Sequence, residues 1–384
     1  MLLNECLEPI PPKYMQSPDE PSDTWTDEMY KNCLAVYATL MPADQMLLMP
    51  LAAVYSSGNN TFKRVVLRIL EPVFRQLSQS MVITLIEDCP PGAETLVARL
   101  VVLLTERTTP TPELIQKMKT LHDERKMDNR ALLPIIGGLE KEQVMRLIPT
   151  FIFRNEYQKS VNVLFRKLYT VRNQQTGELV FDAIEIIQEY HRILPKDDHE
   201  KTFLINNLEF LLEPALLKPD TASQAIEAIF KWDEVPPLFL YSLSILYRKF
   251  KTFESFVANL FYKVTEKKMW RLSERWKQAF YDCIKELKTK AYPAVLSFVT
   301  FEEYEELKEV LGKEVLSEFK AIYLTMATSQ QNSMDERIKE ELHDKEREAR
   351  ERDRKSRKEE RKEKEKTRER ERARDAEKEH RSRR

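Results

Sequence analysis

Few residues in this chain have the chemistry that catalysis or metal binding requires. The five histidines are His122, His191, His199, His343 and His380. The four cysteines are Cys6, Cys33, Cys89 and Cys283. A structural zinc site needs four nitrogen or sulfur ligands at clustered spacing, whereas no cysteine here has another cysteine or a histidine near it in the sequence. We therefore expect no metal, no cofactor and reduced thiols, as in an intracellular protein.

Cys89 is the best candidate for a nucleophile, with His122 as its base. However, Cys89 precedes Pro90 and Pro91 at an expected helix boundary, where a cysteine packs as a small apolar residue. Cys283 lies on an apolar helical stripe and is expected in the core. Because the sequence offers no local base or oxyanion site for a hydrolase, we predict that the protein is not an enzyme.

Gly137 and Gly138 form the only Gly-Gly pair in the chain. Such a pair can belong to a phosphate-binding loop, but that motif follows a strand and continues into Lys-Ser or Lys-Thr. Here Glu140 and Glu142 follow instead, and no strand pattern precedes the glycines. The pattern predicts a corner between two helices.

One helical segment carries residues that suit a protein-binding surface. Trp270 and Trp276 are of the type that dominates interface hot spots, but Trp276 shares an apolar stripe with Phe280, which indicates core packing. The candidate partner-binding residues are Trp270, Lys277, Tyr281, Lys285 and Lys288. The alternative is that the lysines form an ordinary solvated helix face.

The segments that must position these residues have helical periodicity. In residues 221–232, apolar side chains recur at i, i+3, i+4, i+7 and i+8, which places them on one stripe of a helix. Prolines recur at intervals of roughly 17–24 residues, so two helices with their loops approach the period of HEAT repeats, about 40 residues. We predict an all-α fold built as a HEAT-like helical repeat array. The alternative is an irregular all-α domain.

The sequence also predicts where some of the helices begin and end. Thr111 followed by Pro112 is typical of a capped helix start. Thr300 and Glu303 have the spacing of a capping box, and Gly312 is placed to end the helix that they begin. No run of apolar residues is long enough for a membrane-spanning helix.

The C-terminal segment differs from the rest of the chain in its composition. Of the 62 Lys and Arg and 63 Asp and Glu residues, 22 and 18 lie in residues 335–384, which leaves the preceding 334 residues with a net charge of −5. Acid-before-base pairs at i, i+4 support a helix, and the scarcity of apolar residues argues against a core. We predict a disordered or single-helix tail that binds RNA at most weakly. A candidate nuclear signal is formed by Arg354, Lys355, Arg357 and Lys358.

Three motifs are more specific than composition: CPPGAETLV at residues 89–97, PELI at 112–115 and LLPIIGGLEKEQV at 132–144. In this order they resemble the C-terminal half of the symplekins, which are scaffolds of pre-mRNA 3′-end processing. The resemblance covers Trp25 to Gly312. The N-terminal HEAT domain of symplekins, which docks a phosphatase of the RNA polymerase II tail, has no counterpart in this sequence.

The resemblance implies a non-catalytic scaffold in the nucleus. Its partners would be the endonuclease subunit of the cleavage and polyadenylation specificity factor and that subunit's inactive homologue, with the cleavage stimulation factor as a further candidate and no membrane contact. The expected organisation is a flexible lead at 1–23, a helical scaffold domain at 24–325, and a polar hinge and mixed-charge tail at 326–384. The alternative function is an RNA-binding or nuclear interaction protein that acts through the tail, although the net −5 of the preceding residues disfavours RNA binding there.

Overall fold

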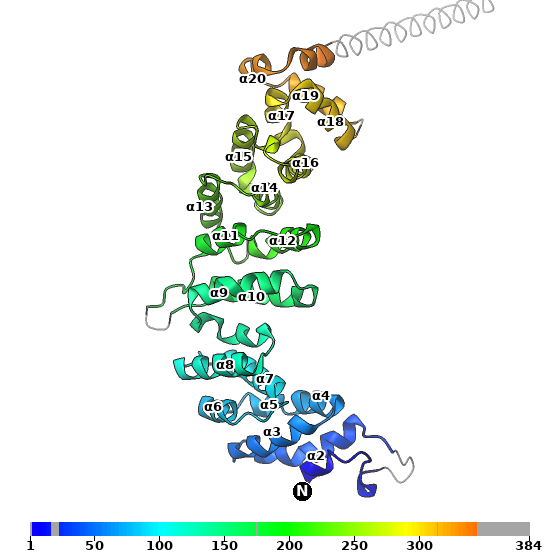
Figure 1. The fold of residues 1–384 in the computed structure, drawn as a ribbon, viewed down its shortest axis with the longest axis vertical. Coiled ribbons are helices and arrows are strands. Elements are labelled where there is room, and N and C mark those ends of the chain that lie inside the picture. The colour runs from blue at the N-terminus through cyan, green and yellow to red at the C-terminus, as the bar shows by residue number, and fades with distance from the viewer. Residues whose placement is uncertain (1, 17–22, 174–175, 313, 344–384) are drawn as a thin grey trace, which may run out of the picture. The chain divides into compact units, whose positions relative to one another are not determined.

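The computed structural model describes residues 2–16, 23–173, 176–312 and 314–343 (Figure 1). Within these ranges the secondary structure consists of α- and 3-10 helices, with one isolated antiparallel bridge between Arg172 and Leu179. The predicted all-α helical array is therefore confirmed. Across the same residues, no helix combines the length and apolar character that a membrane span needs. The chain divides into two compact units, Met1–Ala225 and Ile226–Arg384.

The first unit is a succession of packed helices. Its α-helices are α1 (Leu2–Glu5), α2 (Asp27–Leu40), α3 (Leu48–Ser57), α4 (Asn60–Ile69), α5 (Glu71–Phe74), α6 (Gln79–Glu87), α7 (Glu94–Thr105), α8 (Pro112–Arg125), α9 (Lys141–Ile152), α10 (Gln158–Thr170), α11 (Ala183–His191) and α12 (Asp198–Leu211). Its 3-10 helices are η1 (Lys13–Met15), η2 (Gln45–Leu47), η3 (Asn129–Gly138) and η4 (Asn155–Tyr157). Helix α13 (Pro219–Phe230) crosses the limit between the units.

Each helix of the first unit packs mainly against helices close to it in sequence. Helix α2 contacts α4, α6 contacts α7 and α8, and α9 contacts α10, α11 and α12 (Figure 1). Helix α7 has neighbours on more than one side, because α5, α6 and η3 all contact it. This explains its composition, since its buried side chains include Val101 and Leu103, which lie two positions apart and therefore project about 160° from each other around the helix.

The second unit is also built from packed helices. Its α-helices are α14 (Leu238–Lys249), α15 (Glu254–Glu266), α16 (Glu274–Leu287), α17 (Tyr292–Phe298), α18 (Phe301–Leu311), α19 (Val315–Tyr323) and α20 (Thr328–Ser333). Its 3-10 helices are η5 (Lys251–Phe253), η6 (Met269–Arg271) and η7 (Lys288–Lys290). Helix α14 packs on α16, α15 packs on α17, and α17 packs on α19 and α20.

The predicted helix caps are present. The Thr111 side chain accepts a hydrogen bond from the backbone N–H of Leu114 at the start of α8. Thr300 and Glu303 form the capping box of α18, and Gly312 ends that helix with φ +91°. These local signals were legible because capping depends on residues only three positions apart.

Residues 326–343 are packed, which corrects the expectation of a polar hinge followed by a tail without buried residues. Helix α20 contacts α17, and residues 336–343 are helical. Met334, Ile338 and Leu342 recur every four residues and are all buried. Residues 344–384, with the candidate nuclear signal, lie outside the described residues.

The expected flexible lead is also partly packed. Helix α1 contacts α2 and α3, and Leu3 and Cys6 are buried. The indole Nε1 of Trp25 donates a hydrogen bond to the Glu8 carbonyl oxygen at 2.8 Å. The expectation was wrong for residues 2–16 because it weighed the Pro-rich composition above the few apolar residues in the segment.

We predict that Leu100→Asp abolishes the cooperative unfolding of the first unit. Leu100 is 1% exposed, so the variant buries an unpaired carboxylate at a cost of several kcal/mol, against a total stability of roughly 5–15 kcal/mol. Thermal unfolding followed by far-ultraviolet circular dichroism is the measurement. Leu194→Asp is the matched control, because Leu194 is 78% exposed. A normal melt for Leu100→Asp would contradict the packing of α7.

We predict that a chain ending at residue 330 melts lower than the full chain, whereas a chain ending at residue 343 does not. The shorter chain lacks Met334, Ile338 and Leu342, and full burial of such side chains contributes about 1.5–3 kcal/mol each. Differential scanning calorimetry of the three chains makes the comparison. Identical melting of all three would mean that residues 331–343 do not stabilise the second unit.

Candidate partner-binding surfaces

Two of the five candidate partner-binding residues are buried. Trp270 is 3% exposed and stacks on Phe280 with 4.7 Å between ring centroids, and Phe280 stacks in turn on Phe261. Tyr281 is also buried on the face of α16 that packs within the unit. Neither aromatic ring is available as a surface hot spot, and this part of the interpretation is corrected.

The three candidate lysines have different environments. Lys277 is half-buried, and its Nζ lies 2.5 Å from Glu306 Oε1. Lys285 is exposed and its Nζ lies 3.7 Å from Asp282 Oδ1. Lys288 is exposed just after α16, with φ +48°. A role of these lysines in partner binding stays a prediction.

One exposed apolar residue of the same segment was missed from the sequence. Leu272 follows η6 and is 69% exposed. Its burial could not be judged from periodicity, because it lies between a three-residue 3-10 helix and the start of α16. Leu272 is therefore added to Lys277, Lys285 and Lys288 as a surface candidate in this segment, and the buried Trp270 and Tyr281 are removed.

Trp270 and its neighbour Arg271 converge on Glu303, at the start of α18. The Trp270 Nε1 donates to Glu303 Oε1 at 3.0 Å, and Arg271 donates to both carboxylate oxygens, at 2.7 and 2.8 Å. The backbone N–H of Thr300 donates to Glu303 Oε2 at 2.9 Å. Burial by itself raises the pKa of Glu303, but the hydrogen bonds from Arg271, Thr300 and Trp270 outweigh it and hold the pKa below its ordinary value. The cluster joins η6 to α18 and is structural.

We predict that Glu303→Gln destabilises the second unit by about 1–3 kcal/mol at pH 7, because the side chain loses its charged hydrogen bonds. A carboxyl group whose pKa is lowered by folding stabilises the fold above its unfolded pKa and loses that contribution as pH falls through the folded value. The difference from wild type should therefore shrink below about pH 4.

Denaturant unfolding at several pH values measures this difference. Glu309→Gln is the matched control, since Glu309 is exposed on the same helix. A difference that is independent of pH would exclude the charge of Glu303 as the cause.

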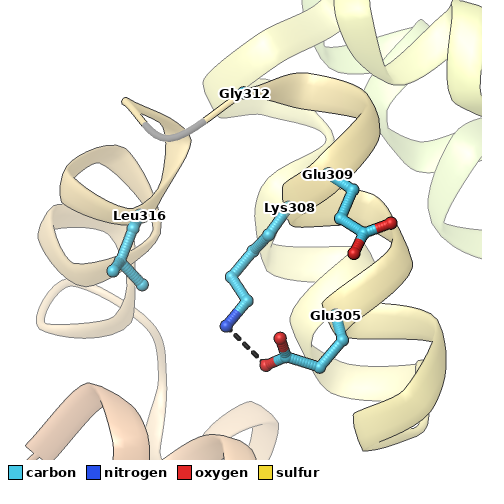
Figure 2. A pocket seen from close by; sticks show the side chains of 5 residues that line it. All are labelled: Glu305, Lys308, Glu309, Gly312 and Leu316. Carbon is cyan, nitrogen blue, oxygen red and sulfur yellow. Dashed lines mark ion pairs between the residues drawn. The ribbon is translucent and has the colours of Figure 1, made fainter.

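A cavity of about 540 Å³ lies beside α18 and α19 and is lined by Glu305, Lys308, Glu309, Gly312 and Leu316. Figure 2 shows Lys308 directed toward Glu305, while Leu316 faces them from α19. The Lys308 Nζ lies 2.5 Å from Glu305 Oε1 and 3.0 Å from Glu341 Oε1. Because its cation is already neutralised by two carboxylates of the same unit, we assign no ligand to this cavity.

A second cavity, of about 660 Å³, lies in the first unit. Its lining comes from the loop between α7 and α8, the end of η3, and the C-terminal turn of α10 with the residues after it; we call it the α7–α10 groove. Gly137 and Gly138 lie in its wall. A Cβ at Gly137 would be 2.3 Å from Val171 Cγ1, and a Cβ at Gly138 would be 2.1 Å from Ile115 Cδ1. The pair is thus a tight helix corner, as predicted.

Cys89 and His122 do not form a catalytic pair. They line different cavities, and the His122 ring nitrogens lie 2.9 Å from Asp123 Oδ1 and 3.2 Å from Asn129 Oδ1. Burial raises the pKa of the Cys89 thiol, which disfavours the reactive thiolate. Burial also raises the pKa of Cys283 to about 12, consistent with its predicted place in the core.

The structure brings together two thiols that are far apart in the sequence. Cys6 and Cys33 are buried and hydrogen-bonded to each other, which raises the pKa of Cys6 and lowers that of Cys33. Met15 Sδ lies 3.3 Å from Cys33 Sγ. Sequence spacing gave no signal of this contact, which arises when α1 packs on α2. In the described part of the chain, no group of three His, Cys, Asp or Glu side chains could hold a metal.

Comparison with known families supports the resemblance seen in the motifs. Residues 128–311 match a family model described as "Symplekin tight junction protein C terminal". The matched range runs from the start of η3 to the end of α18, so it includes the Gly137–Gly138 corner and the Glu303 cluster. It is narrower than the motif resemblance, which began at Trp25. No solved structure matches the chain significantly.

Proposed function

We propose that this chain, a symplekin-like protein, is a non-catalytic scaffold of the pre-mRNA cleavage and polyadenylation machinery in the nucleus. In this role it holds the endonuclease subunit of the cleavage and polyadenylation specificity factor and that subunit's inactive homologue, and the cleavage stimulation factor is a further candidate. The single observation that carries the proposal is the family match at residues 128–311.

The architecture is compatible with this role. Stacked helices present many outward-facing side chains, and repeat proteins use such surfaces to bind other proteins. Holding two proteins on one support raises their effective concentration relative to each other, so the scaffold accelerates a reaction without taking part in its chemistry. The mechanism proposed is therefore positional.

The segment around α16 is our first candidate contact. Leu272 is exposed and apolar just before α16, and Lys285 and Lys288 are exposed cations in its last turn and just after it. An interface of this kind combines one apolar anchor with a charged rim, where the charges contribute to association rate and partner choice. This contact favours a partner surface that carries acidic residues.

We predict that the full chain co-purifies with both nuclease-family subunits after RNA has been digested. Lys285→Glu combined with Lys288→Glu should reduce recovery about tenfold or more, because like charges facing each other across an interface cost several kcal/mol. Quantitative pull-down from nuclease-treated nuclear extract is the measurement. Lys218→Glu combined with Lys251→Glu is the control, since both lysines are exposed at other places in the chain.

The outcomes separate the two functions. Loss of the complex on RNA digestion would favour the alternative, an RNA-binding or nuclear interaction protein that acts through its charged tail. Recovery that is independent of RNA but unchanged by the α16 substitutions would retain the scaffold and exclude this contact. Nuclear entry through Arg354, Lys355, Arg357 and Lys358 is part of the proposal and concerns residues outside the described ranges.

A further inference from the structure

The α7–α10 groove has an excess of positive charge, although the 334 residues before the tail are net acidic. Arg107, Lys167 and Arg172 line it, and Glu106 is the one acidic residue among the described residues of its lining. The Glu106 carboxylate is already engaged, because its Oε2 lies 2.5 Å from Arg75 Nη1. Among the residues that the structure describes, neither Arg107 nor Lys167 forms an ion pair. The cations of the groove therefore lack the neutralisation seen at Lys277, Lys285 and Lys308.

Lys167 is in an unfavourable position for a charged amine. It is half-buried on the last turn of α10, and burial lowers its pKa despite the charge of nearby Glu106. Its protein hydrogen-bond partner is the Pro134 carbonyl oxygen, at a long 3.5 Å. A carboxylate placed in the groove would supply the strong, charge-assisted hydrogen bond that this amine does not make within the chain.

The rest of the lining suits a polypeptide. Pro110, Ile115, Pro134, Val171 and Val180 give the groove an apolar wall. The rim is braced by residues after α10, where the Val180 N–H donates to the Val171 carbonyl oxygen at 3.0 Å, and Arg172 Nη1 donates to the Gly177 carbonyl oxygen at 2.9 Å. The close packing at Gly137 and Gly138 holds this wall in place.

Two features decide between possible ligands. Single-stranded nucleic acid is usually bound by a basic groove that also offers aromatic rings for base stacking, and none of the described residues that line this groove is aromatic. Its volume, about 660 Å³, falls in the usual range of ligand sites, about 300–1,000 Å³. The apolar wall and the unpaired cations are together complementary to a peptide that carries both apolar and acidic side chains.

We propose that the α7–α10 groove binds an extended peptide segment of a partner protein, with an acidic side chain paired to Lys167 and apolar side chains against the wall. Arg107 and Arg172 add attraction for acidic residues that flank the contact. The inference rests on the proposed scaffold function, because it specifies which kind of partner segment the scaffold binds at this groove. Its test uses synthetic peptides, so the two proposals can fail separately.

The test measures fluorescence anisotropy of the full chain with a fluorescein-labelled pool of decapeptides made from Glu, Leu and Pro. Three further probes are a pool with Gln in place of Glu, an oligouridine decamer and inorganic phosphate as competitor. Lys167→Met removes the central charge and keeps the length of the side chain. Lys159→Met is the matched control, because Lys159 is exposed on the same helix outside the groove.

We expect the Glu pool to bind and the Gln pool to bind at least tenfold more weakly. Lys167→Met should weaken binding of the Glu pool about tenfold or more, as for loss of a charged hydrogen bond, with Lys159→Met equal to wild type and neither variant melting below wild type. Arg107→Met, in an exposed loop, provides a second variant if Lys167→Met fails to fold.

Five results would overturn the proposal, and four of them concern the peptide pools, the lysine variants and the RNA decamer. They are absence of binding by the Glu pool, equal binding of the Glu and Gln pools, equal effects of Lys167→Met and Lys159→Met, and tighter binding of the RNA decamer that depends on Lys167. Displacement of the peptide by phosphate at equal concentration would also contradict it, because the apolar wall would then contribute nothing. If the peptide binds but the nuclease subunits do not co-purify, the peptide-binding proposal is retained and the scaffold proposal is rejected.

Discussion

The structure depends on one constraint: each helix has an apolar stripe that must be covered by its neighbours. Consecutive helices provide most of that cover, and short segments outside the longer helices provide the rest. Helix α1 covers part of α2 and α3, and residues 326–343 complete the second unit with Met334, Ile338 and Leu342. The first residues of the charged segment, up to residue 343, are therefore part of the folded second unit.

The features predicted correctly from the sequence are those that depend on residues close together in the chain. The capping residues Thr111 and Thr300, the Gly137–Gly138 corner and the core positions of Trp276 and Cys283 all follow from local spacing. The helical array follows from periodicity repeated along the chain. The stripe of Met334, Ile338 and Leu342 had the same kind of signal, but it was obscured by the surrounding charges.

The errors concern residues whose environment is set by distant parts of the chain. Trp270 lies in a three-residue 3-10 helix, too short to show a period, and its burial depends on Phe280 and on Glu303, which is 33 residues away. Tyr281 lies beside the main stripe of α16 and is buried because α14, α18 and η6 all contact that helix. Cys6 and Cys33 meet only when α1 packs on α2. Composition and period carry no information on such contacts.

The placement of ion pairs distinguishes surfaces that serve the fold from surfaces that are open to a partner. Lys308 and Arg271 each neutralise a carboxylate that joins two segments of the second unit, so their charges are already used in folding. Lys167 and Arg107 lack such partners in the described residues, and Lys167 is held half-buried at a cost that its weak contact with Pro134 does not offset. A folded chain gains nothing from an unpaired, partly desolvated amine. Such an amine is explained when a carboxylate of another protein forms an ion pair with it. For this reason a partner is expected at the α7–α10 groove before the face of α16, where lysines already pair with carboxylates of the same unit.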